Sequence, residues 1–406
     1  MDKFSHAIEY ELALGSSLSI INLIDELIKH AFYIHASDIH IDPLEDKIRI
    51  RFRIDGILED LYFFPKEIYS EVISRIKILS NLRTDEHSSP QDGRFRIKIL
   101  DNESVDIRVS VVPTYYGENI VFRLLSDKSE SFTLGTLGFN EIDEQKIIKA
   151  ITNPTGMILV TGPTGSGKTT TLYTLIKMLN NSEVSIITIE DPIEYSISGV
   201  KQIQVNHKTG LTFANGLRSI LRQDPDIIMV GEIRDTETAN ISINTSLTGH
   251  LLLSTLHTND ASTTLPRLLD MKIEPFLVSS TISLAIGQRL VRKICNNCKI
   301  ERKISKEEYN RLSQIFSKNN ITKSNKFFQG RGCHLCSNTG YKGRTVINEI
   351  LVANEEIRAA ILNKSTNNEI KEIAIKNGMT PMFLDGFNKA ILGITTIEEI
   401  LRVSYE

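Results

Sequence analysis

The feature that most constrains this chain is a glycine-rich run, which matches the G-x-x-x-x-G-K-[ST] pattern of phosphate-binding loops. The run is Gly162-Pro163-Thr164-Gly165-Ser166-Gly167-Lys168-Thr169. An apolar run at 157–160 precedes it, and a helical stretch at 170–179 follows. Glycines let successive backbone N–H groups curl around phosphates, and the start of a helix adds partial positive charge. Because strand, loop and helix occur in this order, a chance glycine-rich turn is the weaker interpretation, and the run predicts a nucleoside triphosphate site.

The residue types in this loop indicate individual roles. We expect Lys168 to reach the β- and γ-phosphates of ATP, and the Thr169 hydroxyl to ligate Mg²⁺. The other loop residues, together with Thr170 at the start of the helix, are expected to contact the nucleotide. The loop by itself does not indicate how the energy of ATP is used.

Four short apolar runs indicate the fold around this loop. They lie at 157–160, 186–189, 227–230 and 251–254, and helical segments separate them. Continuous apolar strands are buried on both faces, which is typical of a parallel sheet between layers of helices. This part of the chain is therefore predicted to be an α/β domain with a parallel-sheet core.

The first 126 residues have a different pattern. At 48–54 apolar residues alternate strictly with polar ones ahead of a glycine, which predicts a half-buried strand that ends in a turn. Three further segments look similar: 95–100, 105–111 and 119–125. A hairpin turn is predicted at Asp101-Asn102, and amphipathic helices are predicted at 18–34 and 67–82. These elements indicate a small α+β domain with an antiparallel sheet.

The change of pattern sets the predicted domain boundaries. Residues 127–138 are polar and contain glycine, so we predict a linker there, between an N-terminal domain at 1–126 and the α/β domain at 139–406. Within the larger domain we expect an insertion at about 293–338 and several short helices from about residue 348.

Two acidic motifs follow predicted strands, and open parallel sheets carry functional groups at the carboxyl ends of their strands. Glu190 follows the run at 186–189, where a carboxylate would lie near the magnesium ion and the attacking water, although an Asp-Pro pair after a strand is more often an ordinary turn. Glu232 follows the run at 227–230, with Gly231 in the place of the usual metal-binding aspartate. Glu232 is therefore the group predicted to deprotonate water or to hold Mg²⁺ through water.

Two histidines bracket the fourth apolar run. His250 precedes it and His257 follows it, with Thr255, Thr258 and Asn259 nearby. A single histidine at such a place is more often structural. Two of them predict a polar network that senses the γ-phosphate, with a structural role as an equal alternative.

All four cysteines occur in two C-x-x-C pairs, Cys295 with Cys298 and Cys333 with Cys336. Four thiolates suffice for a closed tetrahedral Zn²⁺ site with no open position for catalysis. The stretch between the pairs, 299–332, exceeds the spacing of a compact zinc finger, so the metal is expected to pin a longer loop. Four unrelated buried cysteines and an iron–sulfur cluster are the weaker alternatives.

Composition argues against some other classes of protein. The 406 residues carry a net charge of −3, which does not favour general binding of polyanions, so no direct contact with nucleic acid is expected. No stretch approaches the roughly 20 apolar residues that cross a bilayer, and the N-terminus lacks the pattern of a secretory signal peptide. We therefore expect a cytoplasmic protein that reaches a membrane only through a partner.

Taken together, these motifs resemble the assembly ATPases of type II secretion and type IV pilus systems. The four sequence boxes of that family appear in order: the phosphate-binding loop at 162–169, an aspartate box at 187–195, a Gly-Glu variant of the second acidic box at 227–235 and a histidine box at 248–260. Further matching segments lie at 35–43, 51–56, 91–95, 106–110 and 288–292. The resemblance covers nearly the whole chain.

The resemblance implies an architecture and further site residues. Family members have a PAS-like N-terminal domain and a RecA-like ATPase domain, and they assemble into a hexameric ring in which arginines of the N-terminal domain also meet the nucleotide. By match these arginines are Arg108 and Arg123. The family also places arginines on the helix before the second acidic box, here Arg218 and Arg222. At spacing i, i+4 they share one helix face, and they are expected to point at the γ-phosphate or at a ring neighbour.

The resemblance also implies a function. The protein would be a homohexameric, Mg²⁺-dependent ATPase that converts hydrolysis into domain rotation and drives an integral inner-membrane platform protein. The tetracysteine motif is typical of the assembly branch rather than the retraction branch, and the chain looks like a short form without the extra N-terminal domain of longer members. Pilus extension, secretion and DNA uptake all stay open as the process that it serves. A RecA-like nucleic-acid translocase and a nucleotide-gated scaffold without turnover are the alternatives.

Overall fold

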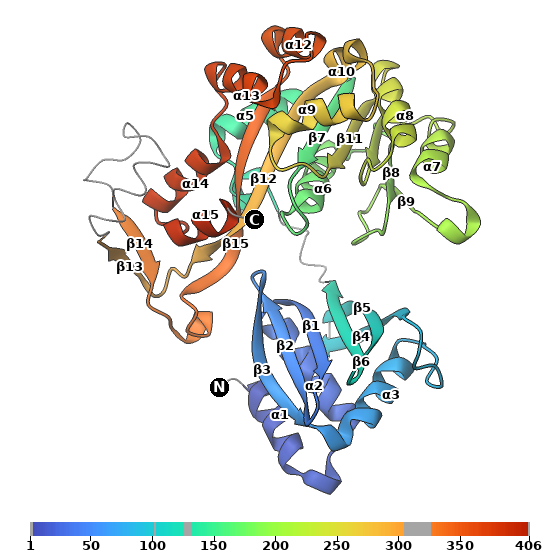
Figure 1. Ribbon diagram of the computed structural model, residues 1–406, viewed down its shortest axis with the longest axis vertical. Helices are drawn as coiled ribbons and strands as arrows, with labels where there is room; N and C mark the ends of the chain where they lie inside the picture. Colours follow the sequence, from blue (N-terminus) through green and yellow to red (C-terminus); the bar gives the residue numbers. More distant parts are fainter. Residues whose placement is uncertain (1–2, 101–102, 126–131, 304–325, 405–406) are drawn as a thin grey trace. The chain divides into compact units, whose positions relative to one another are not determined.

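The computed structural model describes residues 3–100, 103–125, 132–303 and 326–404. The chain divides into two compact units, Met1–Glu130 and Ser131–Glu406, and each has its own sheet and its own hydrophobic core (Figure 1). None of the helices in these ranges has both the length and the apolar composition that a membrane-spanning helix needs. The hairpin turn predicted at Asp101-Asn102 lies outside the described residues.

The N-terminal unit contains a six-stranded antiparallel sheet in the order β3-β2-β1-β6-β5-β4. Its strands are β1 (Ala36–Pro43), β2 (Lys47–Ile54), β3 (Ile57–Pro65), β4 (Gln91–Leu100), β5 (Glu103–Thr114) and β6 (Gly117–Leu125). Helices α2 (Ile20–Tyr33) and α3 (Tyr69–Leu79) pack into the core of this unit, and α1 (Lys3–Ala13) packs against α2. On β2, Ile48, Ile50 and Phe52 are fully buried, because a strand turns alternate side chains to opposite faces. The predicted α+β fold with an antiparallel sheet is confirmed.

The C-terminal unit contains a seven-stranded sheet in the order β15-β12-β7-β11-β10-β8-β9. Its strands are β7 (Gly156–Thr161), β8 (Ile186–Glu190), β9 (Lys201–Gln204), β10 (Ile227–Val230), β11 (Leu251–Leu256), β12 (Ile282–Ile294) and β15 (Tyr341–Val352). All neighbouring strands run parallel except β12 and β15, which are antiparallel. The four predicted apolar runs form β7, β8, β10 and β11, and every residue in these strands is buried. The predicted α/β class is confirmed.

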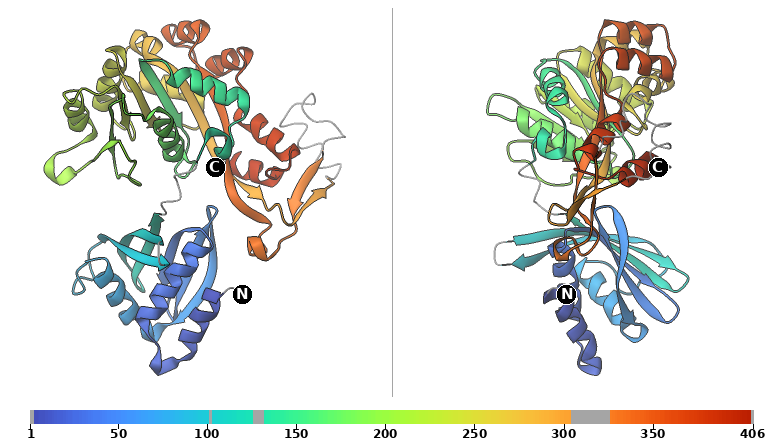
Figure 2. Two further views of the ribbon diagram at one scale, coloured as in Figure 1. Left: turned by 180° about the vertical axis from the view of Figure 1, so that it is seen from behind. Right: turned by 90° about the vertical axis from the view of Figure 1, so that its left-hand side faces the viewer.

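Helices cover both faces of this sheet (Figures 1 and 2). One layer contains α4 (Leu134–Leu137), α5 (Glu141–Ile151) and α6 (Lys168–Leu179). The other contains α7 (Phe213–Ile220), α8 (Thr236–Leu247), α9 (Ala261–Asp270), α10 (Pro275–Thr281), α12 (Glu355–Leu362) and α13 (Asn367–Lys376). Helices α14 (Met382–Ile391) and α15 (Ile397–Ser404) pack beside the long β12–β15 pair. Burial on both faces explains why the parallel strands are continuous apolar runs.

Two sequence-based expectations about elements need correction, and two strands were not predicted. Residues 134–137, assigned to the linker, form α4, whose N-cap is Thr133. The predicted helical end starts at Glu355 rather than near residue 348, because Asn348 lies within β15. The sequence also does not predict the two longest strands of the sheet, β12 and β15. Both strands carry buried polar residues that interrupt the apolar pattern: Gln288, Arg289, Asn348 and Glu349.

Candidate functional site

The glycine-rich loop lies between β7 and α6, at the carboxyl edge of the parallel strands. Its three glycines, Gly162, Gly165 and Gly167, have φ angles of +145°, +79° and +88°, a region that residues with a side chain rarely adopt. Gly167 is the N-cap of α6, so the first N–H groups of the helix open directly onto the loop. The predicted order of strand, loop and helix is confirmed.

Lys168 is the first residue of α6, and its ammonium group turns back onto the loop. Its Nζ donates to Gly162 O at 2.8 Å and to Pro163 O at 3.0 Å. Burial lowers the pKa of Lys168, and the negative charge of Glu232 opposes that shift. A phosphate would offer the ammonium group a charged acceptor, which makes a stronger hydrogen bond than a neutral carbonyl.

Three side chains come together just beyond the ends of β10 and β11. Glu232 Oε1 accepts a hydrogen bond from Arg234 Nη2 at 2.5 Å, and Glu232 Oε2 lies 3.0 Å from His257 Nε2. Burial by itself raises the pKa of Glu232, but the hydrogen bonds and charges of Arg234 and His257 outweigh burial and lower this pKa below its ordinary value. These contacts orient the carboxylate and favour its ionised form, which a group that accepts a proton from water requires.

The sequence predicted Glu232 and His257 as site residues, though not in contact with each other, and it missed Arg234. The only available signal was its position two residues after Glu232 in the same acidic box. Thr255, near the end of β11, connects this strand to the acidic box at 227–235, because its Oγ1 donates to Gly231 O at 2.8 Å.

The structure separates the two histidines that the sequence assigned to one network. His257 meets Glu232, but His250 lies at the other end of β11, where its Nδ1 is 3.1 Å from Thr245 O. Seven residues of extended chain span roughly 23 Å, so the two rings cannot reach one phosphate together. The joint network was wrong, and His250 fits the structural alternative.

Glu190 ends β8 and is only 2% exposed. Its carboxylate accepts hydrogen bonds from Thr188 Oγ1 at 2.6 Å, from Gln202 Nε2 at 3.1 Å and from the Tyr173 hydroxyl. Burial raises the pKa of Glu190, and these donors act against it. These contacts point the carboxylate toward the interior of the protein. Its expected place beside Mg²⁺ and the attacking water stays a prediction.

The two arginines expected on one helix face are arranged differently. Helix α7 ends at Ile220, so Arg218 lies in the helix and Arg222 lies beyond it. Arg222 Nη1 folds back to donate to Arg218 O at 3.0 Å, while Arg218 Nη2 pairs with a Glu237 oxygen at 2.6 Å. The shared helix face was wrong because the helix ends before its next turn. A role for either arginine at the γ-phosphate stays a prediction.

Arg108 and Arg123 lie in the N-terminal unit, directly opposite each other on β5 and β6. Arg94 on β4 is opposite Arg108, so three arginines form one row across the sheet. Arg123 Nε donates to Asp38 Oδ1 at 3.1 Å within the same unit. The expected contact of Arg108 and Arg123 with the nucleotide stays a prediction.

The four cysteines converge on one point, with all Sγ atoms within 4.8 Å of one another. Cys295 to Cys333 and Cys298 to Cys336 are both 3.8 Å apart, and Cys333 to Cys336 is 3.7 Å. Thiolates about 2.3 Å from a zinc ion at the centre of a tetrahedron lie about 3.8 Å apart. The donor set and its spacing therefore fit a closed zinc site.

The cysteine cluster lies at the base of the predicted insertion. Cys295 comes directly after β12, and the second pair comes before β15. Between the pairs, β13 (Lys299–Arg302) and β14 (Phe327–Gly330) form a small antiparallel sheet. Residues 304–325 of the insertion lie outside the described residues.

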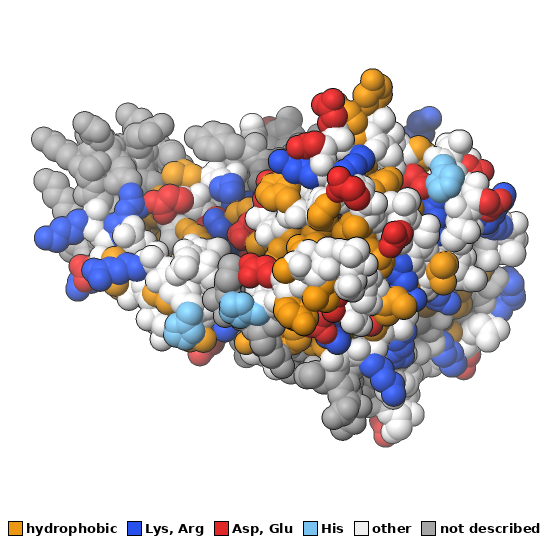
Figure 3. Space-filling model, turned by 90° about the horizontal axis from the view of Figure 1, so that it is seen from below, with side chains coloured by type: hydrophobic (Ala, Val, Ile, Leu, Met, Phe, Trp, Pro, Cys, Tyr) orange, Lys and Arg blue, Asp and Glu red, His pale blue; other side chains and the backbone are white. Residues whose placement is uncertain are grey.

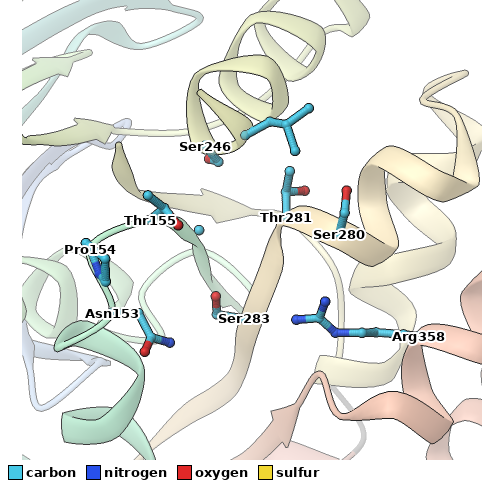
Figure 4. Close-up of a pocket in the computed structure, with 10 residues that line it drawn as sticks. Asn153, Pro154, Thr155, Ser246, Ser280, Thr281, Ser283 and Arg358 are labelled. Atoms are coloured by element: carbon cyan, nitrogen blue, oxygen red, sulfur yellow. The ribbon is translucent and has the colours of Figure 1, made fainter. Parts of the chain in front are cut away.

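A cavity of about 300 Å³ lies away from these groups, at the amino ends of β7 and β12 (Figure 4). Arg358 borders it, with its Nε donating to Ala353 O at 3.1 Å. Helices α8 and α10 end at this cavity, and their last hydroxyl residues donate to carbonyls of their own helix: Ser246, Ser280 and Thr281. A guanidinium group beside two helix C-termini complements their partial negative charge. The arginine thus has a structural explanation, and the predicted site residues lie elsewhere.

Residues 14–402 match the protein family described as Type II/IV secretion system protein. The type II secretion system protein E of Xanthomonas campestris pv. campestris is 48% identical, over 96% of this chain and 68% of that protein. The type IV pilus assembly ATPase PilB of Thermus thermophilus is 46% identical, over 94% of this chain and 43% of that protein. The chain thus spans about two thirds of the first relative and less than half of the second.

Two solved structures are similar over nearly the whole chain. The pilus retraction motor PilT with bound ADP has a TM-score of 0.64 at 27% identity, covering 94% of this chain and 97% of PilT. The ATPase DotB of Legionella pneumophila has a TM-score of 0.68 at 24% identity, covering 94% of this chain and 95% of DotB, a likeness of fold alone.

Proposed function

The chain belongs to the Type II/IV secretion system protein family, and we propose that it is the ATPase that powers type II secretion or type IV pilus assembly. One observation carries this proposal: Glu232, held by Arg234 and His257, follows β10 at the same carboxyl edge of the sheet at which Lys168 of the phosphate-binding loop follows β7. A base for water and a cation for phosphate at the same sheet edge are the parts that ATP hydrolysis needs.

In the proposed reaction, a water oxygen forms a bond to the γ-phosphorus and the bond to the β–γ bridging oxygen breaks. ADP leaves with the electrons of that bond, and Glu232 accepts the proton that the water loses. Lys168 stabilises the negative charge on the β- and γ-phosphates, and His257 holds Glu232 in place. Mg²⁺, held by the Thr169 hydroxyl and through water by Glu232 or Glu190, would neutralise phosphate charge.

The mechanical part of the proposal comes from the family. The protein would form a homohexamer in which Arg108 and Arg123 of the N-terminal unit complete the nucleotide site. Hydrolysis would then rotate one unit against the other and turn or lift an integral inner-membrane platform protein, so that the ring sits at the inner membrane through its partners. Two units with separate hydrophobic cores support this reading, because each can move as a rigid body.

Two substitutions test the enzymatic proposal. Lys168→Ala and Glu232→Gln are each expected to lower ATP turnover by at least about 10²-fold, the usual contribution of such groups. Phosphate release by the purified protein is the measurement, and Glu183→Gln, an exposed glutamate outside the site, is the control. Full turnover in either variant contradicts the proposal. A wild-type protein that binds ATP but shows no single-turnover hydrolysis would instead be the nucleotide-gated scaffold.

The nucleic-acid translocase has less support. On the face drawn in Figure 3, Lys and Arg side chains are interspersed with acidic and apolar ones instead of gathering in one basic tract. Proteins that track nucleic acid usually show a positive groove with aromatic side chains for stacking. ATPase activity that rises with DNA and falls steeply with salt would favour the translocase.

A further inference from the structure

Strand β12 contacts one side of the phosphate-binding loop, and the side chain of Gln288 makes hydrogen bonds there. Gln288 in the middle of β12 is fully buried. Its Nε2 donates to Ser166 O at 2.8 Å, and its Oε1 accepts from Thr171 Oγ1 at 2.8 Å. Gln288 therefore connects the loop to the first turn of α6 and uses both ends of its amide group.

Two loop glycines allow β12 to approach this closely. A Cβ atom on Gly162 would lie 2.3 Å from Gln288 O, and a Cβ atom on Gly167 would lie 3.2 Å from Gln288 Nε2. The first distance is impossible for a real side chain, and the second is tighter than nine in ten such contacts. The loop thus packs directly on the backbone and amide of Gln288, with no room for an intervening side chain.

The hydrogen bond to Ser166 O decides where the next N–H group points. In a planar trans peptide the C=O and the following N–H point in opposite directions. Because Gln288 draws the Ser166 carbonyl toward β12, the Gly167 N–H is directed away from β12. Backbone N–H groups at this place, just before a helix N-terminus, are the donors that bind phosphate oxygens.

We infer that Gln288 is a positioning residue for the phosphate-binding loop: it holds the Ser166–Gly167 peptide in the orientation that binds nucleotide phosphates. This role rests on the proposed nucleotide site. If Gln288 is removed, the peptide is free to rotate. Part of the binding free energy of the nucleotide is then used to order this peptide, so the affinity falls. The competing explanation is a buried amide that contributes only to stability.

Three substitutions separate the two hydrogen bonds. Gln288→Met keeps the length of the side chain and removes both bonds. Gln288→Glu, when ionised, still accepts from Thr171 but cannot donate to Ser166. Thr171→Val removes only the bond between Thr171 and Gln288.

Asn348 provides a matched control for stability. It is directly opposite Gln288 on β15 and is also fully buried, but its Nδ2 donates to Asp143 Oδ2 at 2.8 Å instead of to the loop. Asn348→Leu therefore disturbs a buried polar residue of the same sheet without touching the loop. Its melting temperature measures the general destabilisation, and its Kd for ADP shows how much that destabilisation weakens nucleotide binding.

The experiment is calorimetric titration of the full chain with ADP, well below the melting temperature, together with kcat and KM for ATP. Gln288→Met is expected to raise the Kd for ADP about tenfold, the value of one lost hydrogen bond, and to raise KM more than it lowers kcat. Gln288→Glu is expected to do the same at a pH at which its carboxyl is ionised. Thr171→Val is expected to have a smaller effect, and Asn348→Leu none. Wild-type Kd values in both Gln288 variants, or an equal rise in Asn348→Leu, would overturn the role. Failure of the wild-type chain to bind ADP would instead count against the proposed function.

Discussion

At the scale of single residues, the chemistry of Glu232 depends on the two side chains that hydrogen-bond its carboxylate oxygens. Burial raises the pKa of Glu232, while Arg234 and His257 lower it and prevail. In the proposed reaction Glu232 is the general base, which works only when ionised, so activity is expected above this pKa and is expected to be lost as the pH falls through it. The lowered pKa therefore extends activity toward lower pH.

This balance predicts the effect of replacing Arg234. In Arg234→Gln the pKa of Glu232 rises, because a hydrogen bond and a positive charge are lost, and the acidic limb of kcat/KM moves to higher pH. Arg234→Lys keeps a positive charge and is expected to move the limb less. Initial rates of phosphate release across the acidic range measure this shift. If wild type and Arg234→Gln lose activity at the same pH, Arg234 does not act on Glu232.

At the scale of elements, β12 links the loop to the cysteine cluster. Gln288 in its middle contacts the loop, and Cys295 follows its last residue. Near the same end, Glu399 of α15 accepts from Arg292 N at 3.0 Å and from Arg292 Nη2 at 2.7 Å. Antiparallel β15 and parallel β7 pair with β12 on its two sides, so the strand is held independently of the cysteines.

This arrangement predicts that zinc stabilises the insertion but is not needed for nucleotide binding. Cys295→Ser and Cys333→Ser are expected to lose bound zinc, to lose amide protection in β13 and β14, and to destabilise this region by about 4 kcal/mol, as loss of a structural metal does. Metal analysis and hydrogen exchange measure these effects, and ADP titration is expected to give the wild-type Kd.

A chelator supplies the control for that experiment. Wild-type protein treated with it should show the same exchange pattern as the serine variants. Retention of zinc in Cys295→Ser would show that the four thiolates are not the ligand set. A large loss of ADP binding would show that β12 depends on the metal.

At the scale of the whole molecule, the residues expected at the nucleotide are divided between two units. The loop and Glu232 belong to the C-terminal unit, while Arg108 and Arg123 belong to the N-terminal one. A site of this kind would make turnover depend on both units, although each folds around its own core.

The division predicts that Arg123→Ala lowers turnover by about 10³-fold, the lower range for an arginine that stabilises phosphoryl transfer, while ADP affinity changes little. Steady-state kcat and ADP titration on the full chain measure both effects. Arg123 also pairs with Asp38 in its own unit, so Asp38→Asn is the control that removes the pair and keeps the arginine. Equal turnover in Arg123→Ala and wild type would contradict the role, and equal losses in both variants would assign the effect to the ion pair.

How far the sequence predicts each part depends on the distance between interacting residues. The alternation on β2, the apolar runs of the parallel strands and the order of strand, loop and helix are local patterns, and all three are confirmed. Strands β12 and β15 were missed because their buried polar groups find partners far along the chain: Gln288 bonds Ser166, 122 residues away, and Asn348 bonds Asp143, 205 residues away. A short segment of sequence shows only that polar residues interrupt the apolar pattern of a strand, not that they have distant partners.

The same reason separates what the sequence showed about the candidate site from what it did not. The sequence by itself determined the glycine-rich loop motif, the apolar runs that indicate the α/β class and the two C-x-x-C pairs, because each of these patterns lies within a few consecutive positions. Only the tertiary structure decided that Arg234 joins Glu232 and His257, that His250 lies at the far end of β11, and that Gln288 supports the loop. Hydrogen bonds and burial act between atoms that are close in space, and the packing of the sheet, not spacing in the chain, determines which atoms those are.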